Sequence, residues 1–167
     1  DLFIPCITAA GTGIPAGKTT AGKAAVAVRK SHHKSFALGS FTPAIEGCEW
    51  VILTASPFVI KGFTDPHEAL IRPAVEGTAN VLSSCNAVQT VRRVVLTSSV
   101  ASIYGDAVEI LKAPGGVFTE QLWNTTSSES HQPYSYSKVM AERKAWEICK
   151  NQSAWDLVTI NPSLVMG

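Results

Sequence analysis

Three segments of the chain each combine an apolar, β-branched run with an ending in small polar residues. They are Glu49–Pro57, Arg92–Ser99 and Trp155–Ser163. Apolar runs of this kind are typical of strands that are buried on both faces of a parallel sheet. Helix-forming segments separate the three runs, which indicates an α/β fold. Parallel sheets bind ligands at the carboxyl ends of their strands, so the small polar endings are candidate site residues.

Tyr134 and Lys138 form a second constraint, because they are spaced i, i+4 at the start of a segment rich in helix formers. On a helix this spacing puts a phenol and an ammonium on one face, one turn apart. A free phenol has a pKa near ~10 and is a poor acid–base catalyst at neutral pH. A nearby cation lowers that pKa, so the pair could transfer protons. A Tyr-x-x-x-Lys match alone is weak, and it gains weight from the neighbouring strands.

The segments together predict a coarse order of elements. Strands are expected near 2–8, 24–29, 49–55, 93–99 and 156–161, and helical segments near 40–47, 66–89 and 134–152. Pro73 and Gly77 interrupt the helical pattern of the second of these. The loop before Tyr134 leaves one candidate strand and returns at the phenol, so it should hang over the site.

A family resemblance rests on several motifs that follow one another in order from Gly39 to the last residue. The motifs are Gly39–Phe41, Ala44–Cys48, Ala55–Phe58, Pro73–Leu82, Val95–Ser99, Tyr134–Lys138 and Asn161–Gly167. In this order they resemble the extended short-chain dehydrogenase/reductase superfamily, in the branch of dihydroflavonol, cinnamoyl-CoA and related aldehyde or ketone reductases. The resemblance implies one NAD(P)-binding domain over 1–167, a Rossmann-like, doubly wound parallel sheet that is family-like over 39–167 and divergent over 1–38.

The resemblance also implies an active centre of Ser99, Tyr134 and Lys138. Tyr134 would give a proton to a carbonyl oxygen, Ser99 would hydrogen-bond that oxygen, and Lys138 would keep the tyrosine acidic while holding the nicotinamide ribose. Ser98 and Tyr136 are better interpreted as structural residues that make local hydrogen bonds and packing contacts. Four more residues fall where the family contacts its cofactor: Pro162 and Ser163 beside the nicotinamide, and Ala55 and Ser56 beside the adenosine half.

The first third departs from the family pattern. Gly11–Ala16 fits G-x-G-x-x-A, so Gly11 and Gly13 are candidate phosphate-binding residues, but the family's T-G-x-x-G-x-x-G is absent. Pro15 and Gly22 also argue against the helix that should follow. Gly17-Lys18-Thr19 does not make a nucleoside-triphosphate loop, because Thr12 stands where that loop needs glycine.

Arg29 ends the strand-like run at 24–29, where an arginine could bind the 2′-phosphate of NADP. NADP(H) is therefore the favoured cofactor and NAD(H) remains possible, although a solvated basic patch with Lys30 and Lys34 explains Arg29 as well. Only ten residues lead from Arg29 to Gly39, which leaves no room for the family's second helix and third strand. The chain also stops at Gly167, before the family's substrate domain, so we expect a truncated member.

Composition narrows the possible partners. A net charge of +1 gives no reason to expect nucleic acid, and no apolar stretch suggests a membrane. The four cysteines are dispersed, which favours free thiols in the cytoplasm, and the histidines lie too far from them for a metal site. One domain is expected for 167 residues. The sequence does not predict the oligomeric state.

The function expected from the sequence is an NAD(P)-dependent oxidoreductase that reduces a small-molecule aldehyde or ketone, or oxidises the matching alcohol. Two alternatives stay open. A sugar-nucleotide epimerase or dehydratase, or a hydroxysteroid dehydrogenase, would use the same three residues. A catalytically silent homologue that acts as a binding module would explain the altered glycine motif and the short chain.

Overall fold

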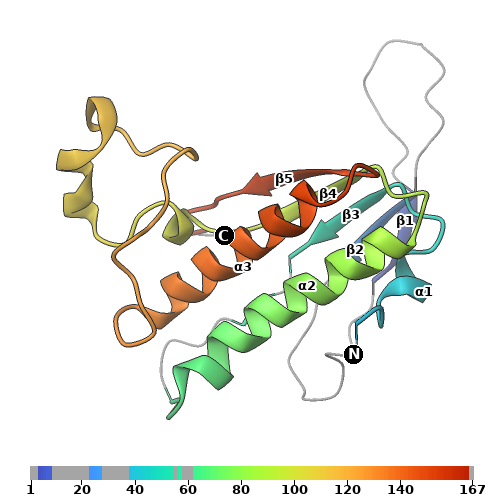
Figure 1. Cartoon of the computed structure of the whole chain (residues 1–167), viewed down its shortest axis with the longest axis horizontal. Coiled ribbons are helices and arrows are strands. Elements are labelled where there is room, and N and C mark those ends of the chain that lie inside the picture. The colour runs from blue at the N-terminus through green and yellow to red at the C-terminus, as the bar shows by residue number, and fades with distance from the viewer. Residues whose placement is uncertain (1–3, 9–22, 28–37, 55, 58–61, 166–167) are drawn as a thin grey trace.

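A computed structural model describes residues 4–8, 23–27, 38–54, 56–57 and 62–165 (Figure 1). Five strands form one sheet in the order β1-β2-β3-β4-β5. The strands are β1 (Ile4–Thr8), β2 (Lys23–Ala27), β3 (Trp50–Leu53), β4 (Arg93–Thr97) and β5 (Asp156–Ile160). Strands β2 to β5 run parallel to one another. The predicted α/β fold with a Rossmann-like parallel sheet is confirmed.

Strand β1 corrects one expectation. A dinucleotide-binding fold should open with a parallel strand inside the sheet, but β1 pairs antiparallel with β2 and lies at the sheet edge. The register between the two strands also shifts between Ile4 and Ile7. Pro5 gives the physical reason, because proline has no N–H for a ladder hydrogen bond and is confined to edge strands and bulges.

The helices follow the predicted order with small changes at their ends. They are α1 (Thr42–Ile45), a π-helical turn η1 (His67–Ile71), α2 (Arg72–Ala87) and α3 (Pro133–Lys150). Pro73 was expected to interrupt a helix over 66–89, but the helical backbone continues across it: Pro73 lies in the first turn of α2, directly after the π-helical turn η1. The i, i+4 pair of Glu68 and Arg72 spans the junction from η1 to α2. None of the helices in the described ranges is long and apolar enough to cross a membrane.

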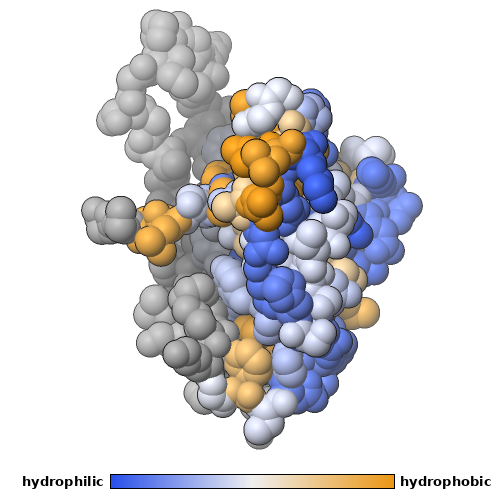
Figure 2. All heavy atoms as spheres, turned by 90° about the vertical axis from the view of Figure 1, so that its left-hand side faces the viewer, coloured by the Kyte–Doolittle hydropathy of each residue, from blue (hydrophilic) through white to orange (hydrophobic). Residues whose placement is uncertain are grey.

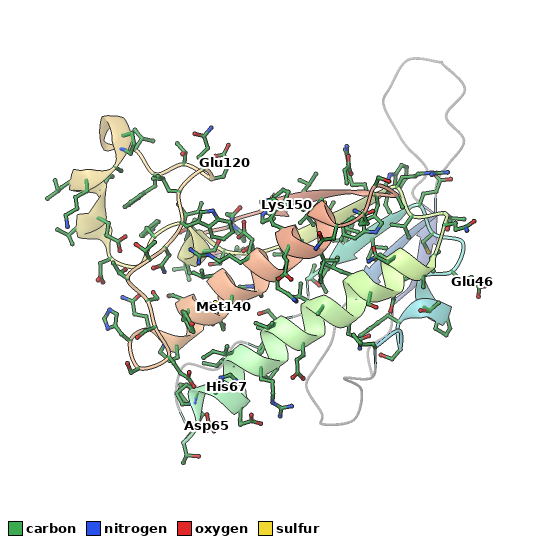
Figure 3. The ribbon with its side chains drawn as sticks, viewed as in Figure 1. Glu46, Asp65, His67, Glu120, Met140 and Lys150 are labelled. Atoms are coloured by element: carbon green, nitrogen blue, oxygen red, sulfur yellow. The ribbon has the colours of Figure 1, made fainter. Side chains whose placement is uncertain are left out.

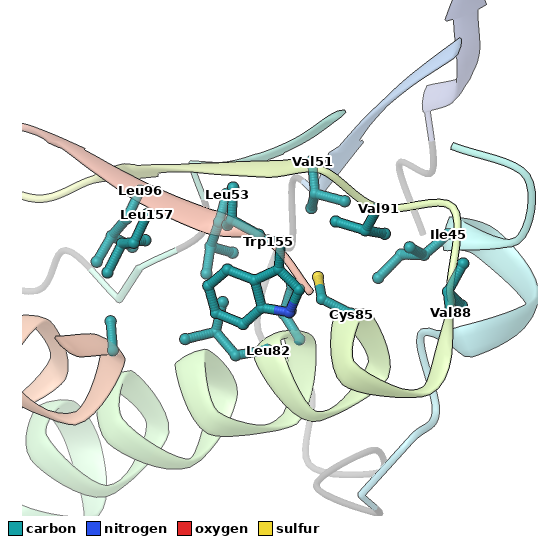
Figure 4. Close-up of a cluster of buried hydrophobic side chains, with 13 residues drawn as sticks. Ile45, Val51, Leu53, Leu82, Cys85, Val88, Val91, Leu96, Trp155 and Leu157 are labelled. Carbon is teal, nitrogen blue, oxygen red and sulfur yellow. The ribbon is translucent and has the colours of Figure 1, made fainter. Parts of the chain in front are cut away.

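Helices α2 and α3 lie side by side over one face of the sheet (Figure 1). Alternate residues of β3 and β4, and Leu157 of β5, point to this face and are buried. With residues from α1, α2 and the connecting turns they form the core of Figure 4, which includes Ile45, Val51, Leu53, Leu82, Cys85, Val94, Leu96 and Leu157. Trp155 packs in this core and donates from Nε1 to Asn86 Oδ1 at 2.9 Å.

A long segment joins β4 to α3 and projects from one end of the sheet (Figure 1). It holds three 3₁₀ turns, η2 (Val100–Ser102), η3 (Ala107–Lys112) and η4 (Pro114–Gly116). The rings of Tyr104 and Phe118 stack within it, with centroids 4.2 Å apart. Val108 and Leu111 of η3 are exposed, and Figure 2 views this end of the molecule, where hydrophobic side chains lie among hydrophilic ones.

Candidate active site

The carboxyl ends of β4 and β5 form the floor of the candidate site. Strand β4 ends at Thr97, two residues earlier than the sequence predicted, so Ser98 and Ser99 follow the strand. The Ser98 amide donates to the carbonyl of Ile160 at 2.8 Å, and the Val100 amide donates to the carbonyl of Pro162 at 3.1 Å. These two bonds fix the turn that carries Ser99 beside the end of β5.

Tyr134 lies in the first helical turn of α3, directly after Pro133. A hydrogen bond links its phenol to Ser99. Gln132, the residue before the helix, adopts a left-handed backbone with φ of 56°, and its Nε2 donates to Asp106 Oδ1 at 2.9 Å. A left-handed conformation is unusual for a residue other than glycine. The start of α3 is thus held by the segment that joins it to β4.

The pKa of Tyr134 is raised above its ordinary value, because the phenol is partly buried; the hydrogen bond with Ser99 opposes this shift. The expectation that Lys138 lowers the pKa of Tyr134 is therefore not met: burial raises that pKa, and the effect that opposes the rise comes from Ser99. The ammonium of Lys138 is directed elsewhere: Nζ donates to the carbonyl of Thr97 at 3.3 Å. At neutral pH the phenol carries its proton and can act as an acid.

Lys138 lies one turn after Tyr134 and only 6 % of its surface is exposed. Burial lowers the pKa of its ammonium from 10.5 to about 8, while the charge of Glu142 opposes the shift. A lysine with a pKa near neutrality can exchange its proton at working pH. Figure 3 labels Met140, which lies between Lys138 and Glu142 on α3.

A small pocket opens beside Lys138. Its lining includes Ser56, Thr78, Thr97, Ser98, Lys138 and Glu142. Ser56 was singled out from the sequence, and its Oγ is buried with no hydrogen-bond partner among the described residues. A buried hydroxyl without a partner is unfavourable, so this wall of the pocket is suited to receive a polar group.

The remaining sequence candidates fall into two groups. Pro162 is partly buried and accepts a hydrogen bond at the site, and Ser163 is exposed just beyond it. Gly11, Gly13, Arg29 and Ala55 lie outside the described residues. Across the described ranges, no cluster of three or more histidine, cysteine or acidic side chains could hold a metal ion.

Sequence reasoning missed three polar residues of the site. Glu142, Ser102 and Asn161 form a buried hydrogen-bond cluster with Ser98 at the back of the pocket. The signal for Glu142 was present, because it follows Lys138 by four residues and Tyr134 by eight and so shares their helix face. Asn161 and Ser102 gave no such signal, since their contacts depend on how three elements pack.

The chain is similar to known proteins in sequence and in fold. The model of the NAD dependent epimerase/dehydratase family matches residues 33–167. The chain is 39 % identical over 132 residues to a cinnamoyl-CoA reductase of Medicago truncatula and 36 % identical over 133 residues to an anthocyanidin reductase of Arabidopsis thaliana. These alignments take in 77 % of the chain but only 39 % and 38 % of the two reductases.

Solved structures show the same fold. The structure of Gre2 from Candida albicans in complex with NADPH matches with a TM-score of 0.68 and 33 % identity, over 78 % of this chain and 41 % of that protein. Yeast methylglyoxal/isovaleraldehyde reductase Gre2 complexed with NADPH matches with a TM-score of 0.65 and 30 % identity, over 77 % and 41 %. The chain thus spans about two fifths of the length of these reductases. It belongs to the NAD dependent epimerase/dehydratase family, as the motifs from Gly39 onward predicted.

Proposed function

We propose that the chain carries the active centre of an NAD(P)-dependent reductase that converts an aldehyde or ketone to the alcohol, with NADP(H) as the preferred cofactor. The hydrogen bond between Tyr134 and Ser99, one helical turn before the buried Lys138, is the observation that carries this proposal. An acid, a hydrogen-bond donor and a cation at the carboxyl end of β4 are what carbonyl reduction requires.

The pocket fits a dinucleotide in one respect that belongs to this chain. Ser56 presents a buried hydroxyl without a partner among the described residues, in the same pocket as the Lys138 ammonium. Both groups suit polar atoms of a dinucleotide, Lys138 at the nicotinamide ribose and Ser56 in the adenosine half, as the family resemblance implies. Pro162 and Ser163 would border the nicotinamide end, as the family resemblance implies. When bound, the reduced nicotinamide supplies the hydride.

The protein's own residues would manage the carbonyl oxygen. Ser99 donates a hydrogen bond to that oxygen as negative charge grows on it, and Tyr134 transfers its phenolic proton to the same oxygen. The proton and the hydride together complete the alcohol. The raised pKa of Tyr134 keeps the proton on the phenol until the oxygen becomes basic. Lys138 would hold the nicotinamide ribose, as the family resemblance implies.

The relatives support the assignment of this chain as a reductase, since they include a cinnamoyl-CoA reductase and an anthocyanidin reductase. Two of the matched structures are complexes with NADPH. Arg29 supports NADP(H) from the sequence, because a guanidinium can bind a 2′-phosphate through two hydrogen bonds. The choice between the two cofactors is therefore testable at a single residue.

The test is to titrate the purified chain with NADPH and NADH by calorimetry and then to follow NADPH oxidation with a panel of aromatic and aliphatic aldehydes and ketones. We expect binding of NADPH and formation of one alcohol for each NADPH consumed. Arg29→Ala should weaken NADPH binding by roughly 1.5–3 kcal/mol and leave NADH nearly unchanged. Binding of neither cofactor would favour the silent homologue instead.

A further inference from the structure

Glu142 is a buried carboxylate that the proposed reaction does not use. Only 6 % of its surface is exposed, and it stands on the turn of α3 that follows Lys138. Removing a carboxylate from water is costly unless several hydrogen bonds replace the lost solvation. The hydrogen-bond partners of Glu142 should therefore explain why its carboxylate is buried here.

The two oxygens of Glu142 have different partners. Oε2 accepts hydrogen bonds from Ser98 Oγ, from Ser102 Oγ at 2.5 Å and from Asn161 Nδ2 at 3.0 Å. Oε1 accepts from Trp146 Nε1 at 3.4 Å. The donors on Oε2 come from the turn after β4 and from the end of β5, so one carboxylate oxygen joins both to α3.

The donors on Oε2 also surround Ser99. Ser98 precedes it, and Ser102 reaches its carbonyl with Oγ at 2.8 Å. Asn161 Nδ2 lies 3.1 Å from the same carbonyl, and the Ala101 amide donates to Ser99 Oγ at 3.2 Å. The position of Ser99 thus depends on side chains that Glu142 itself orients.

The number of hydrogens explains why a carboxylate is needed. Ser98 and Ser102 have one hydroxyl hydrogen each and Asn161 has two amide hydrogens, which makes four for the five contacts to Oε2 and the Ser99 carbonyl, so the Ser102 hydroxyl serves one of these two oxygens at a time. A carboxylate only accepts, so it suits an oxygen that three donors approach. A glutamine would turn its NH₂ either toward these donors or toward Trp146 Nε1, and either choice sets donor against donor.

We propose that Glu142 is a positioning residue for Ser99: through Ser98, Ser102 and Asn161 it holds the Ser99 hydroxyl against Tyr134 in the arrangement that carbonyl reduction needs. This inference rests on the proposed function and adds a residue to that site. A merely structural clamp would stabilise the fold equally but would have no special relation to Ser99, and the two roles predict different results.

The test compares Glu142→Gln with Glu147→Gln, a control on the same helix whose carboxylate is exposed and pairs with Lys144 at 3.1 Å. We expect Glu142→Gln to lower kcat by roughly 10–100-fold, the scale for a displaced catalytic group, with NADPH affinity nearly unchanged. Glu147→Gln should change neither. In a Ser99→Ala background, Glu142→Gln should cause little further loss of kcat. Full additivity of the two losses would overturn the positioning role.

Hydrogen exchange provides a readout that does not depend on activity. The amides of Ala101 and Ser102 donate to Ser99 Oγ and to the Ser99 carbonyl, so their exchange reports how Ser99 is held. We expect Glu142→Gln to speed exchange in the peptide that covers 99–103, with no change for Glu147→Gln. Unchanged exchange would overturn the proposal. If the unmodified chain reduces no carbonyl compound, the proposed function fails, and this exchange still decides whether Glu142 holds Ser99.

Ser102→Ala is the second variant, for the case that Glu142→Gln does not fold. It removes one donor to Glu142 and one bond to the Ser99 carbonyl, but it leaves no buried charge without partners. We expect the same faster exchange over 99–103 and a smaller loss of kcat. A folded Ser102→Ala chain with normal exchange and normal kcat would contradict the inference.

Discussion

The phenol of Tyr134 is hydrogen-bonded to Ser99, which joins the first turn of α3 to the turn that follows β4. Thirty-five positions separate the two residues in sequence, and the whole projecting segment lies between them. The contact exists because β4 ends and α3 begins at the same edge of the sheet, where parallel strands present their carboxyl ends.

Tyr134→Phe should abolish carbonyl reduction and preserve the fold, because only the hydroxyl that carries the proton is removed. The expected fall in kcat is about 10²–10⁴-fold, the usual contribution of a general acid. The control is Tyr136→Phe, which makes the same chemical change two residues further along the helix. Steady-state NADPH oxidation measures both variants. Equal losses at the two tyrosines would exclude Tyr134 as the proton donor.

Local patterns predicted most of the elements. The apolar runs that became β3, β4 and β5 were located to within two residues at each end, because a buried parallel strand has a continuous apolar sequence. The start of α3 was located equally well, since Pro133 is favourable in the first turn of a helix. These features depend only on neighbours in the chain.

Features that depend on distant contacts could not be predicted in this way. The pKa of Tyr134 is raised because its phenol is partly buried, and the i, i+4 spacing does not determine that burial. The antiparallel edge position of β1 depends on its partner, although Pro5 was a usable signal. The cluster of Glu142 with Asn161 needed three elements to meet.

Leu82→Ala tests the core between α2 and the sheet. Leu82 is fully buried among β-strand side chains (Figure 4), so its truncation leaves a cavity and should cost roughly 2–5 kcal/mol of unfolding free energy. Leu111→Ala is the matched control, because 82 % of Leu111 is exposed, and it should have little effect. Urea denaturation followed by circular dichroism measures both. Similar losses for the two variants would contradict this description of the core.

Gly105→Ala tests how the projecting segment is held. A Cβ at Gly105 would lie 2.3 Å from Thr126 Oγ1, which is too close, and 3.0 Å from Asn124 Oδ1, which is a tight contact. Thr126 would have to move and would lose its 2.7 Å bond to Glu109, so we expect a loss of about 1–3 kcal/mol in unfolding free energy.

Gly77→Ala is the control for that substitution. Nothing lies within 4 Å of a Cβ at Gly77, which is inside α2. Alanine is the better helix former, so this change should stabilise the chain by roughly 0.5–1 kcal/mol. Thermal or urea unfolding of both variants gives the comparison. Stabilisation by Gly105→Ala would show that the segment around Thr126 is not packed as described.

Lys138→Met tests the burial of the site ammonium through the pH dependence of stability. The pKa of Lys138 is about 8 in the folded chain and 10.5 is its ordinary value, so between these pH values the unfolded chain binds more protons than the folded one. The free energy of unfolding of the unmodified chain should therefore rise with pH across that window, relative to Lys138→Met, which has no ionisable group at this position. Below pH 8 both states are protonated and the cost of burying the charge is fully present.

We expect Lys138→Met to have its greatest advantage in melting temperature at pH 6–8 and to lose that advantage progressively toward pH 10, while carbonyl reduction is abolished throughout. Melting curves of the two chains at matched ionic strength measure this difference. A constant difference across the pH range would mean that Lys138 titrates alike in both states and is not buried as a charge.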